Sequence, residues 1–165
     1  MTTKSPEAGS IAYQMSRPAE EYVNDQAVEM AWATKAWEHA RIHMNLLCAI
    51  DPKNLTLTQA DDKVYSKFRQ WFEELPLDPI TEEDLKSVSA KTKWREFCEL
   101  FKEEVDDYNF GTLLRIDPRG RYDSCNTILV ARVQFLAIEV ARNKEGVNSK
   151  HRADYAKLES DQPFG

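Results

Sequence analysis

The stretch DYNFGTLLRID, residues 107–117, is the part of this 165-residue sequence that least resembles a helix. Helix-type sequence ends at Asp107, and two aromatic residues around an asparagine, a glycine and a run with strand character follow. Residues 117–120 then place Asp, Pro and Gly at the positions that a type I turn favours. We therefore expect a short β-hairpin or an irregular loop here, in which residues 112–116 pair briefly with residues 121–122.

Upstream of this stretch, apolar spacing predicts one long helix that begins near Asn24 or Asp25 and ends at Asp51-Pro52. Its apolar residues form two adjacent stripes at helical spacing. A face that wide predicts contacts with at least two other elements, so we expect this helix to be the central one. The stripes are Met30, Ala33, Trp37, Ala40, Met44 and Leu47, and Trp32, Ala36, His39, His43, Leu46 and Ile50.

Three further helices are predicted before residue 107. One follows Thr58 with Asp61 in capping-box position, a short one follows Thr81, and a third carries Trp94. The third ends in the acidic run EEVDD, residues 103–107, which is unfavourable at a helix C-terminus and requires a cation nearby. The expected core residues of the first and third of these helices are Val64, Phe68, Trp71, Phe72, Leu75, Trp94, Phe97, Phe101 and Val105.

The last predicted helix begins near Asn126 or Thr127 and ends at Gly146, although its β-branched opening leaves a strand there open. The fold class is thus all-α: a single-domain bundle of about five helices with a short irregular or β-hairpin insert near residues 108–123. We expect a disordered N-terminal arm over residues 1–20, the helical domain over residues 21–147 and a polar C-terminal tail over residues 148–165.

Composition excludes several functional classes. A net charge of −6 and a pI near 5.2 argue against a nucleic-acid partner and against an anionic membrane surface. No segment reaches the roughly 18 apolar residues of a membrane span, and the N-terminus lacks the apolar core of a secretion signal. Three cysteines without CxxC spacing fit free thiols in a reducing compartment. We expect a cytoplasmic or nuclear protein.

Candidate catalytic chemistry is sparse. His39 and His43 are four apart, a spacing at which two imidazoles can share a metal, but Arg41 lies between them and no third ligand is identifiable, so packing of both rings on the apolar face is the favoured explanation. Cys125 precedes a predicted helix start and is the thiol best placed for reactivity, while Cys48 and Cys98 lie at the edges of core faces. No glycine motif for phosphate is present. We expect no enzyme, no catalytic residue, no cofactor and no metal, and a metal- or thiol-dependent enzyme remains the alternative.

Charge is unevenly distributed along the chain. Residues 111–152 contain eight Lys and Arg against four Asp and Glu, a net charge of +4, so the remainder carries −10. This asymmetry fits steering toward a charged partner or internal pairing with the acidic run at 103–107, and both interpretations stay open. The aromatic residues of this segment could instead seal the helical core, and for Phe110 that interpretation is the favoured one. The predicted partner-binding residues are Tyr108, Asn109, Phe110, Arg115, Arg119, Arg121, Tyr122, Asn126 and Arg132.

Four segments in this order resemble a eukaryotic family called polysaccharide biosynthesis domain-containing protein one. They are EYVNDQAVEMAWATKAWEHA (residues 21–40), AKTKWREFC (90–98), DYNFGTLLRID (107–117) and NTILVARVQFLAIEVARNKEGVN (126–148). The likeness covers residues 20–149. A wider family with the same label includes plant cell-wall enzymes, but no binding site for a methyl donor is recognisable in this sequence. The long charged C-terminal extension of some members is not matched.

The resemblance implies a small helical protein that acts as an ATP-independent, ribosome-associated chaperone. Its implied client is nascent translation elongation factor 1-alpha, which it protects until folded, and we expect the protein to be a monomer. The residues alone leave open an adaptor that binds another protein. On the chaperone hypothesis, Tyr108→Ala or Arg115→Glu should weaken client capture while thermal stability stays near that of the wild type.

Overall fold

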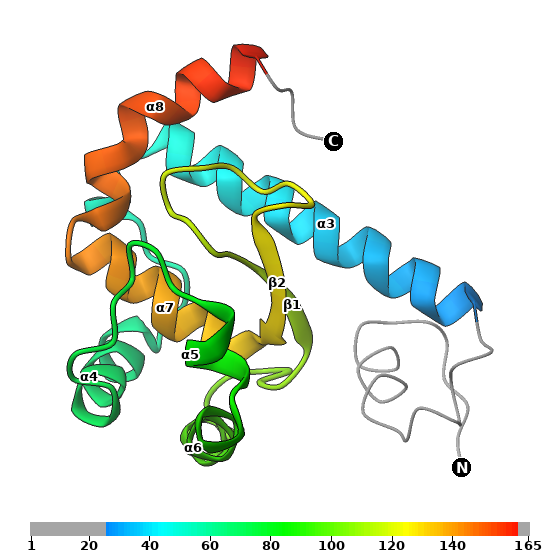
Figure 1. The fold of residues 1–165 in the computed structure, drawn as a ribbon, viewed down its shortest axis with the longest axis vertical. Helices are drawn as coiled ribbons and strands as arrows, with labels where there is room; N and C mark the ends of the chain where they lie inside the picture. The colour runs from blue at the N-terminus through cyan, green and yellow to red at the C-terminus, as the bar shows by residue number, and fades with distance from the viewer. Residues whose placement is uncertain (1–25, 162–165) are drawn as a thin grey trace.

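The structure, a computed structural model, describes residues 26–161, with side chains to residue 158. This part contains six α-helices, one 3-10 turn and a two-stranded antiparallel sheet (Figure 1). The elements are α3 (Gln26–Ala49), η1 (Pro52–Asn54), α4 (Asp61–Trp71), α5 (Glu82–Lys86), α6 (Val88–Glu99), β1 (Gly111–Arg115), β2 (Thr127–Ala131), α7 (Arg132–Lys144) and α8 (Val147–Asp161).

The predominantly helical class is confirmed, but the chain is not a pure all-α bundle because residues 111–115 and 127–131 form a sheet. The expected arm at residues 1–20 and the expected helix start near Asn24 lie outside the described residues. Over residues 26–161, no helix has both the length and the apolar content needed to cross a membrane.

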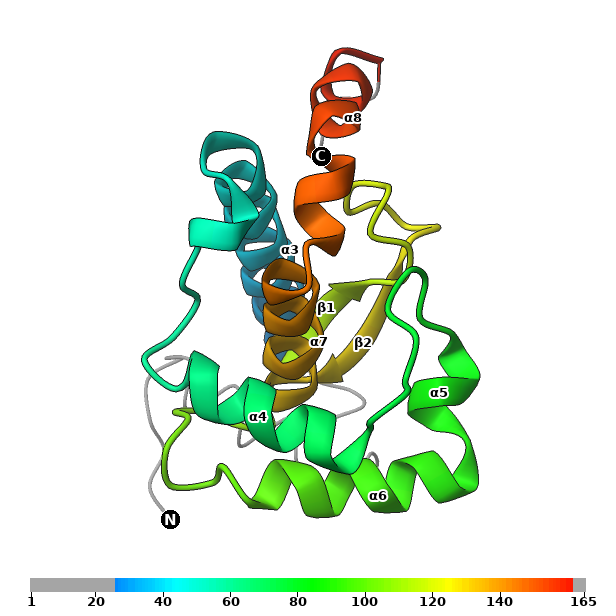
Figure 2. The ribbon, with the colours of Figure 1, turned by 90° about the vertical axis from the view of Figure 1, so that its left-hand side faces the viewer.

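Helix α7, rather than α3, is the central helix. Ten of its 13 residues are buried, and it packs against α4, α6, α8 and both strands (Figure 2). Helix α3 lies at one side of the domain, where it contacts β1 and α8. Its N-terminal half therefore leaves Met30 and Trp37 exposed, although apolar spacing placed both in the core. The wide apolar face of α3 misled the prediction because its two stripes are buried only in part.

The sheet pairs β1 with β2 in a register that sets Gly111 opposite Ala131 and Arg115 opposite Thr127. A β-turn is present at residues 117–120, where the sequence predicts one, since the Gly120 amide donates to the Asp117 carbonyl at 3.1 Å. The expected pairing with residues 121–122 is wrong, and the strand replaces the expected helix start at Asn126 or Thr127.

The side chain of Asn126 explains this difference. It donates to the carbonyls of Asp117 and Arg121, both at 3.0 Å, and accepts from the Asp117 amide at 2.9 Å. These bonds close residues 117–126 into a loop. Strand pairing with β1 therefore begins only at Thr127, opposite Arg115. The Gln134 side chain then accepts from the Ala131 amide at 2.8 Å and starts α7.

Aromatic side chains from α4, its C-terminal end and α6 form a cluster that packs against α7, as the helical spacing predicted. Phe72 and Trp94 stack with ring centroids 4.1 Å apart, and Phe68 and Phe97 complete the cluster. Such pairs each contribute about 0.5–1.5 kcal/mol beyond their buried area. The Thr81 capping box is also confirmed, with reciprocal bonds to Asp84 of 3.1 and 3.0 Å.

Residues 147–161 form helix α8 instead of the expected polar tail. Gly146, at a positive φ of 82°, makes the turn from α7 that a residue with a Cβ adopts only with strain. Asn148 and Tyr155 of α8 are fully buried. The packed domain thus extends past the predicted boundary at residue 147.

Candidate functional site

Arg115, predicted to bind a partner, lies instead in a fully buried network behind the sheet. Its Nε and Nη2 atoms donate to the two carboxylate oxygens of Glu139 at 3.2 and 3.0 Å. Its Nη1 atom donates to the carbonyls of Pro118 and Gly120, both at 3.1 Å, and Nη2 donates to Asn148 Oδ1 at 2.8 Å. The guanidinium therefore ties β1 to α7, α8 and the loop over residues 116–126.

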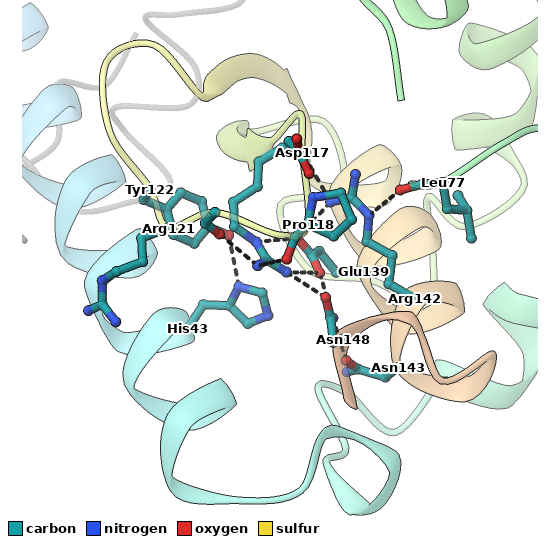
Figure 3. A network of polar contacts seen from close by, with 12 residues as sticks. His43, Leu77, Asp117, Pro118, Arg121, Tyr122, Glu139, Arg142, Asn143 and Asn148 are labelled. Atoms are coloured by element: carbon teal, nitrogen blue, oxygen red, sulfur yellow. Dashed lines mark hydrogen bonds and ion pairs between the residues drawn. The ribbon is translucent and has the colours of Figure 1, made fainter. Parts of the chain in front are cut away.

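Arg142 forms the second arm of this network (Figure 3). It donates to Glu139 at 3.1 Å and to the carbonyls of Leu77, Arg115 and Ile116 at 3.0, 2.8 and 2.9 Å. A single carboxylate is thus shared by two guanidinium groups, and the backbone at the end of β1 is held from both sides. The signal in the sequence was a lone glutamate inside the apolar run FLAIEVA with an arginine three residues later.

The network fixes the charge states of its members. Burial alone would raise the pKa of Glu139, but Arg115 and Arg142 more than offset it and hold that pKa far below its usual range. Burial lowers the pKa of His43 to about 3, so this imidazole is neutral at pH 7, and it lies 2.8 Å from the Tyr122 hydroxyl. Removing one partner of a buried ion pair, such as that of Glu139 with Arg115, lowers the free energy of unfolding by about 3–5 kcal/mol.

Five of the nine predicted partner-binding residues belong to this network or to the loop beside it. Arg115, Arg121 and Tyr122 are buried, so in this conformation they cannot contact a partner. Asn126 closes the loop by the bonds given above. Arg119 is exposed and pairs with its neighbour Asp117 at 2.8 Å. The structure therefore assigns structural contacts to most of this group.

The remaining four predicted residues lie elsewhere. Tyr108, Asn109 and Phe110 precede β1 at the opposite end of the hairpin, and Arg132 begins α7. Phe110 is half-buried, between the two interpretations left open for it. The nine residues do not form one continuous surface.

Part of the positive charge of residues 111–152 is paired with acidic side chains elsewhere in the described chain. Besides the buried network, Lys144 pairs with Asp62 at 2.6 Å and Lys150 with Asp78 at 3.7 Å. The acidic run at 103–107 lies beyond the end of α6 at Glu99, so the expected helix C-terminus there is wrong, and Lys63 pairs with Glu104 at 2.7 Å. Among the described residues, no ion pair joins a cation of residues 111–152 to the acidic run, so the expected internal pairing is not found and steering toward a charged partner stays open.

A groove beside Tyr108 is the candidate binding site. It lies between α6 and the start of β1 and has a volume of about 390 Å³. We call it the Tyr108 groove. Its lining residues are Leu85, Lys86, Lys91, Trp94, Arg95, Cys98, Glu99, Tyr108, Asn109, Ala131 and Gln134.

The rim of the Tyr108 groove is positive. Three cations, Lys86, Lys91 and Arg95, face a single carboxylate, Glu99, which accepts a bond of 2.7 Å from the Tyr108 hydroxyl. Burial, and then the charge of Lys91, lower the pKa of Lys86. The sequence interpretation missed these cations because they lie outside residues 111–152, although the spacing of Lys91 and Arg95 on one helix face was readable.

The floor of the groove is apolar and unreactive. Leu85, Trp94 and Cys98 are buried there. Burial raises the pKa of the Cys98 thiol to about 12, so the thiolate needed for nucleophilic chemistry does not form at pH 7. A positive rim around an apolar floor suits a chain that presents acidic and apolar side chains together.

His39 and His43 both pack edge-on against Phe135, each with ring centroids 5.1 Å apart. This confirms ring packing for the two histidines. Within residues 26–158, no group of three or more His, Cys, Asp or Glu side chains is arranged to hold a metal ion.

Comparison with known proteins gives consistent matches. A profile of the family described as PBDC1 protein matches residues 28–153. Over 144 residues the chain is 52% identical to Protein PBDC1 of Mus musculus and 51% identical to that of Homo sapiens. Both alignments cover 87% of this chain, and they span 73% of the mouse and 62% of the human protein.

A fungal relative and its fold agree with these matches. Protein PBDC1 homolog of Saccharomyces cerevisiae is 40% identical over 134 residues, which cover 79% of this chain and 92% of that protein. A solution NMR structure of the Saccharomyces cerevisiae protein yst0336 has a TM-score of 0.71 and 39% identity. That similarity also covers 79% of this chain and 92% of the other.

Proposed function

The chain belongs to the family of PBDC1 proteins, and from this membership we propose that it is an ATP-independent chaperone of nascent translation elongation factor 1-alpha. It meets this client at the ribosome and protects it until folding is complete. The client is taken from the family resemblance. The chain's own residues supply the chemistry of the binding surface.

The Tyr108 groove is the observation that carries the proposal. Its volume of about 390 Å³ is large enough for several side chains of an extended segment. Leu85, Trp94 and Cys98 line the floor with largely buried apolar side chains, while Lys91 and Arg95 are exposed cations at the rim. An unfolded chain offers apolar and acidic side chains together, whereas a finished fold buries the apolar ones.

The groove is built on rigid elements, which suits repeated capture. Its walls come from α5, α6 and the start of α7, and the aromatic cluster fixes α6 against α4. Binding to an unfinished state lowers the free concentration of aggregation-prone chain by mass action and requires no nucleotide. Release follows when the client buries the segment that the groove held.

The proposal is of a monomeric binding protein, not an enzyme, in the cytoplasm or nucleus. The test is capture of the tagged protein from a translating extract, with identification of the nascent chains that it retains. Enrichment of elongation factor 1-alpha over other nascent chains supports the proposal. Recovery of unrelated chains in equal measure contradicts a dedicated client, and recovery of a mature folded protein instead indicates an adaptor.

A further inference from the structure

A second, smaller cavity lies between α3 and α7, and we call it the His39 cavity. Its volume is about 130 Å³, several times the roughly 30 Å³ that one water occupies in the liquid. Apolar side chains that include Ile42, Leu57 and Leu136 form most of its wall. The polar lining consists of Thr56 and three nitrogen-bearing side chains, His39, His43 and Arg132.

Each of these three side chains carries a buried nitrogen without a partner. Between residues 26 and 158, no hydrogen-bond partner is within reach of His39 Nδ1, His43 Nε2 or Arg132 Nε. His43 is only 3% exposed. Buried polar nitrogens are normally paired, so three around one cavity point to a group that enters it.

The proton on His43 can be assigned from its contact with Tyr122. The Tyr122 hydroxyl lies 2.8 Å from His43 Nδ1. Burial raises the pKa of Tyr122 and lowers that of His43, so a neutral phenol faces a neutral imidazole. The phenol is the better donor and the imidazole nitrogen the better acceptor, which leaves the proton of His43 on Nε2 as an unused donor.

The charge around the cavity is positive. Among the described residues, Arg132 has no carboxylate partner, and after burial its charge is the next cause that lowers the pKa of His39. Behind His43, Arg115 and Arg142 share the single carboxylate of Glu139, which leaves one excess positive charge. A ligand with acceptor atoms and a negative charge would satisfy these groups together.

We propose that the His39 cavity binds a carboxylate group carried on a short aliphatic stem. The Arg132 guanidinium neutralises its charge, His39 and His43 donate N–H groups to its oxygens, and the apolar wall contacts the stem. The carboxylate can belong to a free short-chain acid or to a glutamate of another chain. This site is distinct from the Tyr108 groove and does not depend on the proposed chaperone role.

The test observes the Arg132 Nε–H and the imidazole nitrogens of His39 and His43 by NMR. Sodium butyrate is titrated into ¹⁵N-labelled protein, with sodium chloride at matched ionic strength as the reference. Saturable shifts at these nitrogens with butyrate alone are expected. A second arm uses a peptide with blocked ends that contains one Glu, and its Gln counterpart. Saturation by the Glu peptide but not by butyrate assigns the carboxylate to another chain, and saturation by butyrate assigns it to a free acid.

Two variants make the result specific. Arg132→Gln should weaken binding by at least about tenfold, because a charged hydrogen bond is lost, whereas Arg95→Gln in the Tyr108 groove should leave it unchanged. Leu57→Phe fills the cavity without altering charge and should also abolish the shifts. Absence of saturation in both arms, equal shifts with chloride, or full binding by both Arg132→Gln and Leu57→Phe overturns the proposal.

Discussion

Arg115 of β1 and Glu139 of α7 form a two-pronged ion pair in which neither side chain has any exposed surface. The pair joins the sheet to the central helix, and Arg142 shares its carboxylate. This arrangement makes the hairpin a fixed part of the domain. The segment that looked irregular in the sequence is therefore held by fully buried polar contacts.

Glu139→Gln should lower the free energy of unfolding by about 3–5 kcal/mol, because it leaves Arg115 and Arg142 buried without a counter-charge. Urea denaturation measures the change. The matched control is Arg119→Gln, whose pair with Asp117 is exposed to solvent and should contribute little to stability. Equal effects of the two substitutions would contradict the structural role of the network. Arg115→Glu, expected from the sequence to spare stability, should now unfold the domain.

Stability should fall as the pH decreases below about 6.5, the ordinary pKa of histidine. The pKa of His43 is about 3 in the folded protein, so between these values the unfolded state binds one more proton than the folded state. The free energy of unfolding then decreases by about 1.4 kcal/mol for each pH unit lost.

Denaturation between pH 7 and pH 5 isolates this effect from Glu139, whose contribution is lost only below its ordinary pKa of about 4.3. Between pH 7 and pH 5 the free energy of unfolding of the wild type should fall by about 2 kcal/mol because of His43, and His43→Gln should lack this decrease. A smaller slope should persist in the variant, because burial also lowers the pKa of His39. An unchanged slope in His43→Gln would show that His43 is not held neutral.

The three thiols should react with iodoacetamide in the order of their exposure. Cys125 is exposed, Cys48 is half-buried, and Cys98 is buried with its pKa raised to about 12. Mass spectrometry of the native protein at pH 8 should find Cys125 modified first and Cys98 last, with the difference abolished in denaturant. Early modification of Cys98 would mean that the floor of the Tyr108 groove opens.

Helix α8 should be required for the stability of the hairpin. The Tyr155 hydroxyl donates to the Pro118 carbonyl at 2.6 Å and accepts from Arg115 at 3.0 Å. Tyr155→Phe should therefore cost about 1–3 kcal/mol, since it leaves buried polar groups unpaired. The neighbouring exposed residue supplies the control, because Asp154→Asn should change stability by less than about 0.5 kcal/mol. If Tyr155→Phe melts at the wild-type temperature, α8 does not contribute to the stability of the hairpin.

The elements that could be predicted from the sequence are those that depend on residues close together in the chain: helices with apolar spacing, a capping box and a turn. Phe68 of α4, Phe72 directly after it, and Trp94 and Phe97 of α6 recur at helical spacing, and their burial follows from it. The Thr81 capping box was readable for the same reason, because both partners lie within three residues. The turn at 117–120 was likewise set by its own residues.

Features that depend on distant partners were not predictable in this way. Glu139 and Arg115 are 24 residues apart, and charged residues are rarely buried unless paired, so Arg115 was assigned to the surface. The partner strand at 127–131 was only an open alternative because apolar β-branched residues also suit a buried helix. The cations of the Tyr108 groove meet Tyr108 and Asn109 only in the folded domain.

The double substitution Lys91→Glu and Arg95→Glu should reverse the charge of the groove rim and abolish client binding. Both residues are exposed, so the free energy of unfolding should stay within about 1 kcal/mol of the wild type. Lys102→Glu is the matched control, since this exposed lysine lies outside the groove lining. A large loss of stability in the double variant would assign these cations a structural role.

The most direct test of the chaperone account measures newly made elongation factor 1-alpha in a translation extract depleted of this protein. The measured quantity is the fraction of the client that remains soluble and bound to the purified protein after ATP is removed. The account predicts that wild-type protein and Lys102→Glu restore this fraction and that the Lys91→Glu, Arg95→Glu variant does not. Equal restoration by all three proteins, or no binding of the client by the wild type, would contradict it.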